Sequence, residues 1–497
     1  MKSFLTSVVS VAALCAFADI QLSDLVEISS DTVVSEQVSG SGGYVIKNGA
    51  KLTLAHADNA FTGGVSIQNG YLEATASGAF GTGPIVLETS AATKSILLNA
   101  ADGIFGNAIT VKDVGGSEAS PTICLLASAT LTGVVSLDQG MSDLRNQSIA
   151  VKLGQSTSDT SVKLTFANQV LAGTGGILML GWGQADFKAK VSCGDYRGMN
   201  LGNGNFSQSG TVRLYCPDNE IRRISMSYFQ LRCEAAHVID NMIYNLYYPA
   251  MKINGGFLFT RYPQDFGLLT TSSGTEIDWS DGDGYAAAIR NEDSTTLQEF
   301  RLTAKNTSGT SGRCHMRFYG PINLVMTNMT ANGAKFYQGF AGRDQSQMTG
   351  RIEVNNNCQF RCLNGCRFSN VTNLLLRSGA EMTFEALSSL TTPVGNTFTS
   401  LQDLKLEGTS FIRVDTAKAV NPINSPEATL CMDSDSRIYL MPGVEMTVKR
   451  LFVNGEKIPA GDYTSENLEQ LRHWSASYNG GVLHVLKGSI GMSIFVR

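Results

Sequence analysis

Two short β-prone stretches, each reached through a glycine turn, follow one another in Asn59-Ala60-Phe61-Thr62-Gly63-Gly64-Val65-Ser66-Ile67-Gln68-Asn69-Gly70-Tyr71-Leu72. Apolar and polar residues alternate along each stretch with the period of two that is typical of a strand. Glycine and asparagine supply the backbone freedom that a sharp turn needs. Similar units recur at Lys163–Phe166, Thr211–Tyr215, Phe257–Thr260, Arg351–Val354, Asn373–Leu376, Leu404–Leu406 and Ser410–Val414. The pattern predicts an all-β protein.

The composition agrees with many short strands joined by turns. Charged residues make up 16% of the 497 residues, and the chain has 51 glycines and 11 prolines. A hydrophobic content of 43% is enough for a packed core, which argues against wholesale disorder. The net charge of −5 gives no basic footprint for nucleic acid, so we expect no nucleic-acid partner.

Two architectures compete for this pattern, a series of antiparallel sandwiches and a β-solenoid. No stretch reads as a linker between domains, yet single cores usually stop growing near about 250–300 residues. A solenoid escapes that limit because each coil contacts only its neighbours. We therefore predict a single-stranded, right-handed parallel β-helix over residues 19–440, with about 20–25 residues per coil.

Residues 49–87 carry the most specific motif. The order of a strand, the turn Asn59–Gly64, a second strand, Asn69-Gly70-Tyr71-Leu72 and then Gly81-Thr82-Gly83-Pro84 resembles the autotransporter-associated β-strand repeat, at about 44–90. The resemblance implies a passenger-like β-helix. On physical grounds we expect Gly63 and Gly64 to form a corner and Asn59 to bond backbone groups there or to stack on asparagines of adjacent coils. Phe61 is expected to cover an end of the core.

The C-terminal part, residues 441–497, is predicted to be a β cap with one short helix. Its block at 444–486 is similar to the C-terminal module of exported β-helix proteins from Verrucomicrobia-, Planctomycetes- and Lentisphaerae-type bacteria. Asn454-Gly455 suits a type I′ hairpin with Leu451, Val453 and Ile458 facing inward. Thr464 to Trp474 is expected to form the helix, with Thr464 or Ser465 as its N-cap. A solenoid needs such a cap because its last coil otherwise exposes an unpaired edge.

The N-terminal residues predict export. Lys2 gives a short positive region, Phe4 to Phe17 is apolar or small, and Ala16-Phe17-Ala18 fits a cleavage site, so residues 1–18 read as a signal peptide. After Asp19 no apolar stretch approaches the roughly 20 residues of a membrane span. We expect a secreted or outer-surface location without an integral membrane segment in the mature chain.

Catalytic signatures of β-helix enzymes are missing from the sequence. The polygalacturonase-like pattern needs paired aspartates, a histidine beside glycine and an R-x-K, and none of these occurs. The five histidines are isolated and read as solvated or structurally hydrogen-bonded: His56, His237, His315, His473 and His484. We predict no catalytic residue, no cofactor and no metal site.

Three other clusters have both a structural and a functional interpretation. Cys358-x3-Cys362-x3-Cys366 departs from usual zinc and iron–sulfur spacings and favours a disulfide or buried thiols. Asp278 to Tyr285 could hold calcium, but an Asx-rich turn is favoured. An aromatic group is either a sugar-stacking platform or, as we favour, internal packing or a dimer contact. Its members are Tyr244, Tyr247, Tyr248, Phe257, Phe259 and Tyr262.

These observations predict a non-catalytic exported β-helix that acts as a surface scaffold or adhesin, with a glycan or a surface protein as a possible partner. The alternative is a polysaccharide-active β-helix enzyme, a lyase or glycoside hydrolase, whose carboxylates converge on one face. A second alternative is a self-assembling structural protein of the cell envelope.

Overall fold

A computed structural model of the chain describes most of residues 19–487. The described residues are 19–88, 94–112, 122–138, 147–194, 197–202, 209–239, 243–244, 251–254, 256–260, 264–270, 276–279, 287–291, 293–304, 310–314, 317–329, 335–341, 345, 347–355, 357–363, 366–385, 395, 397–416, 419–471 and 480–487. Within these ranges every regular element is a β-strand. The all-β class predicted from the sequence is confirmed.

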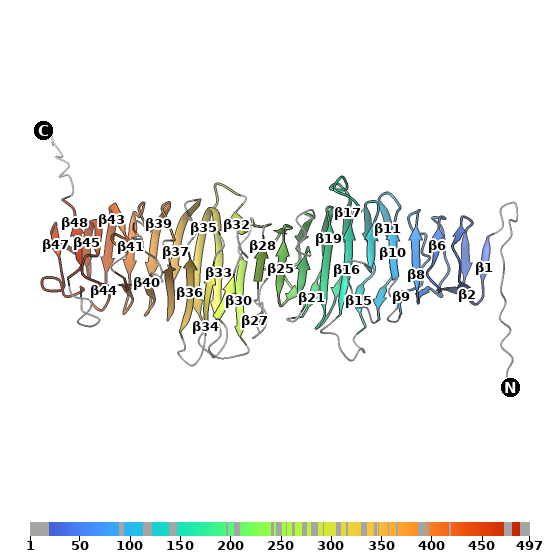
Figure 1. Ribbon diagram of the computed structural model, residues 1–497, viewed down its shortest axis with the longest axis horizontal. Coiled ribbons are helices and arrows are strands. Elements are labelled where there is room, and N and C mark those ends of the chain that lie inside the picture. Colours follow the sequence, from blue (N-terminus) through green and yellow to red (C-terminus); the bar gives the residue numbers. More distant parts are fainter. Residues whose placement is uncertain are drawn as a thin grey trace, which may run out of the picture. The chain divides into compact units, whose positions relative to one another are not determined.

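The chain divides into two compact units, Met1–Arg232 (unit 1) and Cys233–Arg497 (unit 2). In both units the strands stack side by side as the rungs of a solenoid (Figure 1). Each sheet below is named after its first strand.

Unit 1 has three long faces. The β2 sheet contains β2 (Leu25–Ile28), β5 (Gly43–Ile46), β7 (Val65–Ile67), β9 (Ile85–Leu87), β12 (Ile109–Val111), β15 (Val135–Leu137), β18 (Val170–Leu171), β21 (Val191–Cys193) and β24 (Glu220–Ile221). The β3 sheet contains β3 (Thr32–Val34), β6 (Ala50–Leu54), β8 (Gly70–Ala74), β10 (Lys94–Leu98), β13 (Ile123–Leu125), β16 (Ser148–Leu153), β19 (Gly176–Gly181), β22 (Met199–Leu201) and β25 (Ile224–Ser227). The β11 sheet contains β11 (Gly103–Phe105), β14 (Ala129–Leu131), β17 (Lys163–Phe166), β20 (Gln184–Phe187), β23 (Thr211–Leu214) and, where the unit ends, β26 (Gln230–Cys233). A separate pair joins β1 (Ile20–Leu22) to β4 (Val38–Gly40).

Unit 2 has two long faces. The β27 sheet contains β27 (Ile243–Tyr244), β29 (Gly256–Thr260), β30 (Gln264–Thr270), β32 (Ala287–Asn291), β33 (Gln298–Ala304), β35 (Arg317–Asn328), β37 (Met348–Val354), β39 (Val371–Leu376), β41 (Asp403–Leu406), β43 (Asn424–Met432), β45 (Glu445–Val453), β46 (Glu456–Ile458), β47 (Gly461–Tyr463) and β48 (Val482–Val485). The β31 sheet contains β31 (Glu276–Trp279), β34 (Thr310–Cys314), β36 (Phe336–Ala341), β38 (Cys358–Leu363), β40 (Glu381–Glu385), β42 (Phe411–Val414) and β44 (Arg437–Leu440). Strand β28 (Met251–Asn254) also belongs to this unit.

The pairing within these faces is that of a parallel β-helix. Consecutive strands such as β5 and β6 occupy different faces, and each pairs in parallel with the equivalent strand of the next coil. Ile85 pairs with Val65, 20 residues earlier, whereas Val170 pairs with Val135, 35 residues earlier. The predicted coil length of about 20–25 residues is therefore right for the short coils and too small for the longest.

Inward side chains form columns that run from coil to coil. Ile46, Ile67 and Leu87 occupy equivalent positions of the β2 sheet and are fully buried. Aromatic rings stack in the same way: the ring centroids of Phe166 and Phe187 lie 4.6 Å apart, and the two ring planes are nearly parallel. Burial of such columns supplies the main stabilisation, about 25 cal/mol per Å² of apolar surface.

The corner at Asn59–Gly64 is built as the sequence predicts. Gly64 has a φ of +76°, which a glycine adopts without strain. The Asn59 side chain accepts a hydrogen bond from Val38 N (2.7 Å) and donates one to Ala79 O (2.7 Å). It thus ties its own coil to the coils on both sides. Phe61 is fully buried inside the core, against Tyr44 at 5.4 Å between ring centroids.

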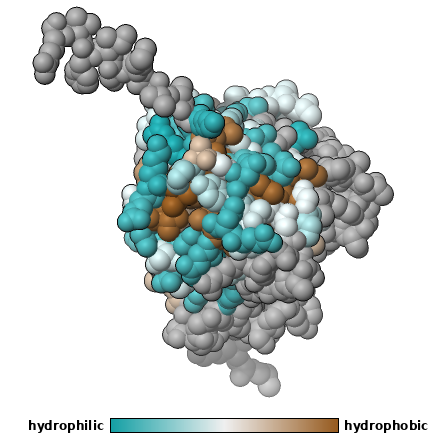
Figure 2. All heavy atoms as spheres, turned by 90° about the vertical axis from the view of Figure 1, so that its left-hand side faces the viewer, coloured by the Kyte–Doolittle hydropathy of each residue, from teal (hydrophilic) through white to brown (hydrophobic). Residues whose placement is uncertain are grey.

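The C-terminal strands depart from the parallel pattern. β45 turns back into β46 through Asn454 (φ 49°) and Gly455 (φ 79°), which confirms the predicted two-residue hairpin. Leu451 is buried, and Val453 and Ile458 are half-buried. On the end of unit 2 that carries β47 and β48, hydrophobic surface shows in separate patches between hydrophilic strips (Figure 2).

The short helix predicted from Thr464 to Trp474 is wrong over its described part. Residues 464–471 form turns, and Leu471 makes a parallel bridge to Ile438. One turn does form at its expected start, where the Asn467 side chain accepts a hydrogen bond from Thr464 N (2.7 Å) and Leu468 N donates one to Thr464 O (3.1 Å). Pairing with the adjacent strand then replaces further helical turns, because buried packing outweighs local propensity. The signal peptide and Trp474 lie outside the described residues.

Candidate functional site

The outer face of the β11 sheet carries a charged cluster formed by Lys163, Asp186, Lys188 and Arg213, which we name the Asp186 cluster. Phe166, Phe187 and Leu214 are register partners that point into the core. Side chains alternate along a strand, so the residue before each of them points outward. Register therefore aligns Thr165, Asp186 and Arg213 in one outward row.

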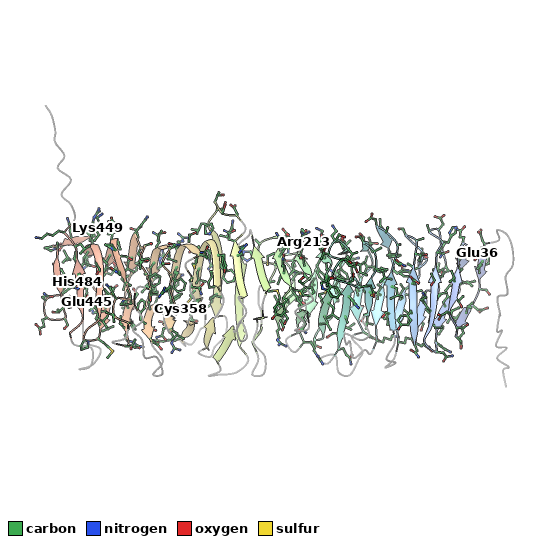
Figure 3. All side chains as sticks on the ribbon, turned by 45° about the horizontal axis from the view of Figure 1, so that its top comes forward. Glu36, Arg213, Cys358, Glu445, Lys449 and His484 are labelled. Carbon is green, nitrogen blue, oxygen red and sulfur yellow. The ribbon has the colours of Figure 1, made fainter. Side chains whose placement is uncertain are left out.

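Three cations surround the carboxylate of Asp186. Its Oδ2 lies 3.7 Å from Lys163 Nζ and 3.5 Å from Lys188 Nζ, and its Oδ1 lies 3.8 Å from Arg213 Nη1. Asp186 is only 2% exposed, while the cationic side chains are 30–46% exposed. Figure 3 places Arg213 among the side chains that crowd this part of unit 1. One buried carboxylate thus lies 3.5–3.8 Å from three partly exposed cationic groups.

The remaining contacts fix these cations further. Lys188 Nζ lies over the Tyr215 ring, 3.1 Å from its centroid, so the aromatic face holds the ammonium group in place. Buried Asp186 Oδ1 accepts no hydrogen bond from the described residues. The outward neighbours along the rows are Thr130, Thr165, Gln184 and Thr211, which offer hydroxyl and amide groups. This outer face therefore combines cationic side chains with hydroxyl and amide groups.

A second polar cluster lies on the outer face of the β31 sheet in unit 2. Arg361 donates to both carboxylate oxygens of Glu385, at 2.9 and 2.6 Å. Arg413 Nε lies 2.8 Å from Asp415 Oδ1, and Lys335 pairs with buried Glu381. Each of these three cations thus contacts a different carboxylate.

In this second cluster the carboxylate of Glu385 is held in the charged state. Burial alone raises the pKa of Glu385, but the hydrogen bonds from Arg361 and Thr383 lower it below its ordinary value. Among the described carboxyl groups whose pKa is displaced, the direction is downward in each. A lowered pKa suits ion pairing, whereas a general acid at neutral pH needs a raised one.

Two histidines are structurally hydrogen-bonded, as predicted. His56 Nδ1 accepts a hydrogen bond from Asp58 N at 3.1 Å. His484 Nδ1 lies 2.7 Å from Asp462 Oδ1, and its Nε2 lies 3.6 Å from Glu445 Oε2 (Figure 3). His237 is exposed and has a φ of 58°. His315 and His473 lie outside the described residues.

The cysteine cluster consists of buried thiols. Cys358, Cys362 and Cys366 are at most 4% exposed and are not bonded to another cysteine. Burial raises the pKa of the Cys358 and Cys362 thiols, which keeps them protonated and poor as ligands or nucleophiles. In the described ranges no three His, Cys, Asp or Glu side chains are placed to hold a metal ion. Four other described cysteines are also free: Cys124, Cys193, Cys216 and Cys431.

The other sequence candidates lie largely outside the described residues. Only Asp278 and Trp279 of the proposed calcium loop are described, as the end of β31, and without their side chains. The aromatic side chains of Tyr244 to Tyr262 are likewise outside the described part.

Sequence reasoning missed the Asp186 cluster because its members are 23 to 27 residues apart between neighbouring coils. A signal was nevertheless present. Aligning Phe166, Phe187 and Leu214 as one inward column places Thr165, Asp186 and Arg213 in one outward row.

No helix long and apolar enough to cross a membrane occurs in the described ranges. Comparison with known proteins gives the chain no relatives: no protein-family model, no curated protein and no solved structure matches it. Its class therefore rests on its own architecture, a parallel β-solenoid.

Proposed function

We propose that this protein is an exported, surface-displayed β-helix that acts as a non-catalytic scaffold or adhesin. The proposal rests on the difference between the inward and the outward side chains of the strands. Inward positions form an apolar column, whereas outward positions of successive coils form continuous polar rows such as Thr130, Thr165, Asp186 and Arg213. Such rows provide a long, rigid contact surface whose side chains do not need to change shape on binding.

The state of the ionisable groups supports a binding role. Glu385 and Asp415 each form an ion pair, and the pKa of Glu385 is lowered. The buried Cys358 and Cys362 thiols have raised pKa values and are therefore poor nucleophiles. These groups are held in the states that stabilise a folded scaffold.

A polysaccharide-active enzyme is the second candidate, and one observation favours it. Glu381, Glu385 and Asp415 lie on the outward face of neighbouring strands of the β31 sheet. Enzymes that cleave polysaccharides by acid–base chemistry use two carboxyl groups in one site. In this candidate, the loss of one of these carboxylates abolishes turnover.

The experiment separates the two candidates with the full-length protein. It is incubated with a panel of neutral and acidic polysaccharides, and both reducing ends and unsaturated products are measured alongside retention on the same immobilised polymers. Binding without product supports the adhesin. Product formation that disappears in Glu385→Gln but persists in the control Glu27→Gln, on the β2 sheet of unit 1, would establish the enzyme instead.

A further inference from the structure

We propose that the outer face of the β2 sheet in unit 1 binds a neutral linear polysaccharide. The inference rests on the proposed adhesin function and names both the ligand class and the face that binds it. The face is built on one outward row of residues, which we name the uncharged row. Its members come from seven consecutive strands of the sheet and are register partners: Val45, Ser66, Val86, Thr110, Ser136, Leu171 and Ser192.

The pairing register places the side chains of the uncharged row outside the core. Ile46, Ile67 and Leu87 each follow a member of the row directly, and all three are fully buried. Side chains alternate along a strand, so the members of the row point away from the core. All seven members are half-buried, which leaves part of each side chain open to a ligand.

The row ends in an ion pair on both sides. Register continues it to Glu27 beyond Val45 and to Glu220 beyond Ser192. Lys47 Nζ lies 2.8 Å from Glu27, and Lys190 Nζ lies 2.7 Å from Glu220. The formal charges of this row therefore stand at its two ends, each beside an opposite charge, and the stretch between them is uncharged.

A second uncharged row widens the face. It consists of the residues that come directly before five of the strands, and their carbonyl groups accept hydrogen bonds from the preceding coil: Gly64, Pro84, Ala108, Val134 and Gln169. Most of these side chains are small or missing, so they do not rise above the neighbouring row. The two rows together form a neutral strip that runs across the rungs.

The chemistry of the strip matches that of a sugar. Val45, Val86 and Leu171 offer methyl groups, and the other four members of the uncharged row offer hydroxyl groups, which both donate and accept hydrogen bonds. A pyranose ring likewise has C–H groups on its faces and hydroxyl groups around its rim. A neutral sugar chain that lies along the strip can therefore cover the methyl groups and bond the hydroxyl groups in turn.

The size of the strip favours a narrow ligand over a globular protein or a second copy of this chain. Seven rungs about 4.8 Å apart and two rows of side chains give a strip about 30 Å long and about 10 Å wide, or about 300 Å². A stable protein interface buries about 800 Å² on each partner. The strip supplies less than half of that area.

The strip also lacks what other linear partners require. An extended peptide adds to a sheet through free backbone groups, whereas here the backbone bonds from coil to coil, as Val65 N does to Pro84 O (2.9 Å). A lipid surface calls for a continuous apolar face, and a nucleic acid calls for cations along its phosphates. We therefore assign the strip to a neutral saccharide.

The test measures retention of the full chain on swollen cellulose and on mannan, with polygalacturonate as the charged polymer. We expect retention on a neutral polymer that changes by less than about twofold when salt is raised from about 0.05 to about 0.5 M, because no charge takes part. Competition by soluble cellohexaose, compared with binding to microcrystalline cellulose, shows whether the ligand is a single chain or the surface of a fibre.

Two serine variants form a matched pair. Ser136→Lys places a charge in the middle of the uncharged row, and Ser225→Lys places the same charge on the outer face of the β3 sheet of the same unit. Both serines are half-buried between two buried neighbours, and circular dichroism melting checks that both variants are folded. We expect Ser136→Lys to bind the neutral polymer about tenfold more weakly, because the ligand would bury an unpaired charge, and Ser225→Lys to bind as the original protein does.

The outcomes separate the site from the wider function. Equal loss in both variants, or no loss in either, overturns the strip as the site and leaves the adhesin proposal standing. Retention on polygalacturonate alone, or on none of the polymers, overturns the ligand class. A dimer in sedimentation analysis that Ser136→Lys dissociates would replace the saccharide by a second copy of the chain. Release of reducing ends or unsaturated products overturns the adhesin proposal itself.

Discussion

Gly64 and Gly49 share a left-handed backbone conformation, with φ of +76° and +78°, but differ in their surroundings. A Cβ added at Gly64 would lie 2.1 Å from Pro84 O of the next coil, whereas one at Gly49 would meet nothing within 4 Å. The corner glycine is therefore required by the approach of two coils as well as by its φ.

This difference gives a matched pair of variants. Gly49→Ala should lose about 1 kcal/mol of unfolding free energy, from backbone strain alone. Gly64→Ala should lose about 3 kcal/mol or more, because the neighbouring coil must also move. Urea unfolding of both variants measures the two losses. Equal losses would mean that the close approach at Gly64 is relieved without cost.

Asn59 provides a second prediction for a single residue. Asn59→Ala leaves Val38 N and Ala79 O without their side-chain partner in a buried corner, which should cost about 3 kcal/mol. Gln37 also joins two coils, through a hydrogen bond from its Nε2 to Asp58 O (2.9 Å), but at the surface. Gln37→Ala should change stability by less than about 0.5 kcal/mol. Equal losses of stability in the two thermal melts would mean that the buried hydrogen bonds of Asn59 contribute no more than the exposed one of Gln37.

Single residues were predictable where the cause was local. Gly63, Gly64 and Asn59 were assigned to a corner because turn chemistry can be read from a few neighbouring residues. Asp186 was not found because its environment is made by residues of other coils, and the register that joins them depends on the length of each intervening loop.

Among the strands, β21 carries a titratable group in the interior column. Burial raises the pKa of Cys193 to about 12, from 9.0 for an exposed thiol. Between these two values the unfolded chain loses the thiol proton while the folded chain retains it. Stability from this group is therefore complete below pH 9 and declines as the pH rises toward 12, by up to about 1.4 kcal/mol per pH unit.

The predicted pH dependence is tested with two cavity variants of the same strand. Cys193→Ala removes both side-chain volume and thiol, so its stability should decline less steeply above pH 9 than that of the original protein. Val191→Ala removes volume only, at a fully buried position, and should lose a similar amount at every pH. Parallel curves for all three proteins, measured by urea unfolding from pH 7 to 11, would contradict the assignment.

The sequence predicted the strands correctly, but it predicted a helix where the C-terminal segment forms turns. Alternation and glycine turns identified the strands from Tyr44 to Ile85 because every coil repeats the same local rule. The segment after Thr464 begins with one hydrogen-bonded turn but forms no helix over its described residues, and Leu471 pairs with Ile438. That contact joins residues far apart in sequence, and local propensity does not report it.

At the scale of the whole molecule, a stack of coils should lose order locally. In the parallel faces of unit 1 each strand pairs with its equivalents in adjacent coils, so damage at one corner should spread to near neighbours and then decay. In Gly64→Ala, amide hydrogen exchange should accelerate in β5, β7 and β9, while the strands from β41 to β45 keep their protection. Uniform acceleration over all strands would show that the chain opens as a single cooperative unit.

The solenoid architecture was predictable from the whole sequence, because repeated short strands without linkers leave few alternatives. Coil length was less predictable. Val135 and Val170 are paired across 35 residues, and Val170 and Val191 across 21, yet both pairs are parallel.

The 35 − 21 = 14 additional residues of the longer coil leave the parallel pairing on both sides intact. Part of this length forms the turn between β16 and β17, where Asp159 accepts hydrogen bonds from Gln155 N (2.6 Å) and Ser156 N (2.8 Å). A foreign epitope grafted at this turn should therefore be presented to an antibody while the rungs beneath it stay paired. Coils of such a protein can therefore differ in loop length, and so in the side chains that they expose, while the paired strands beneath the loops stay the same.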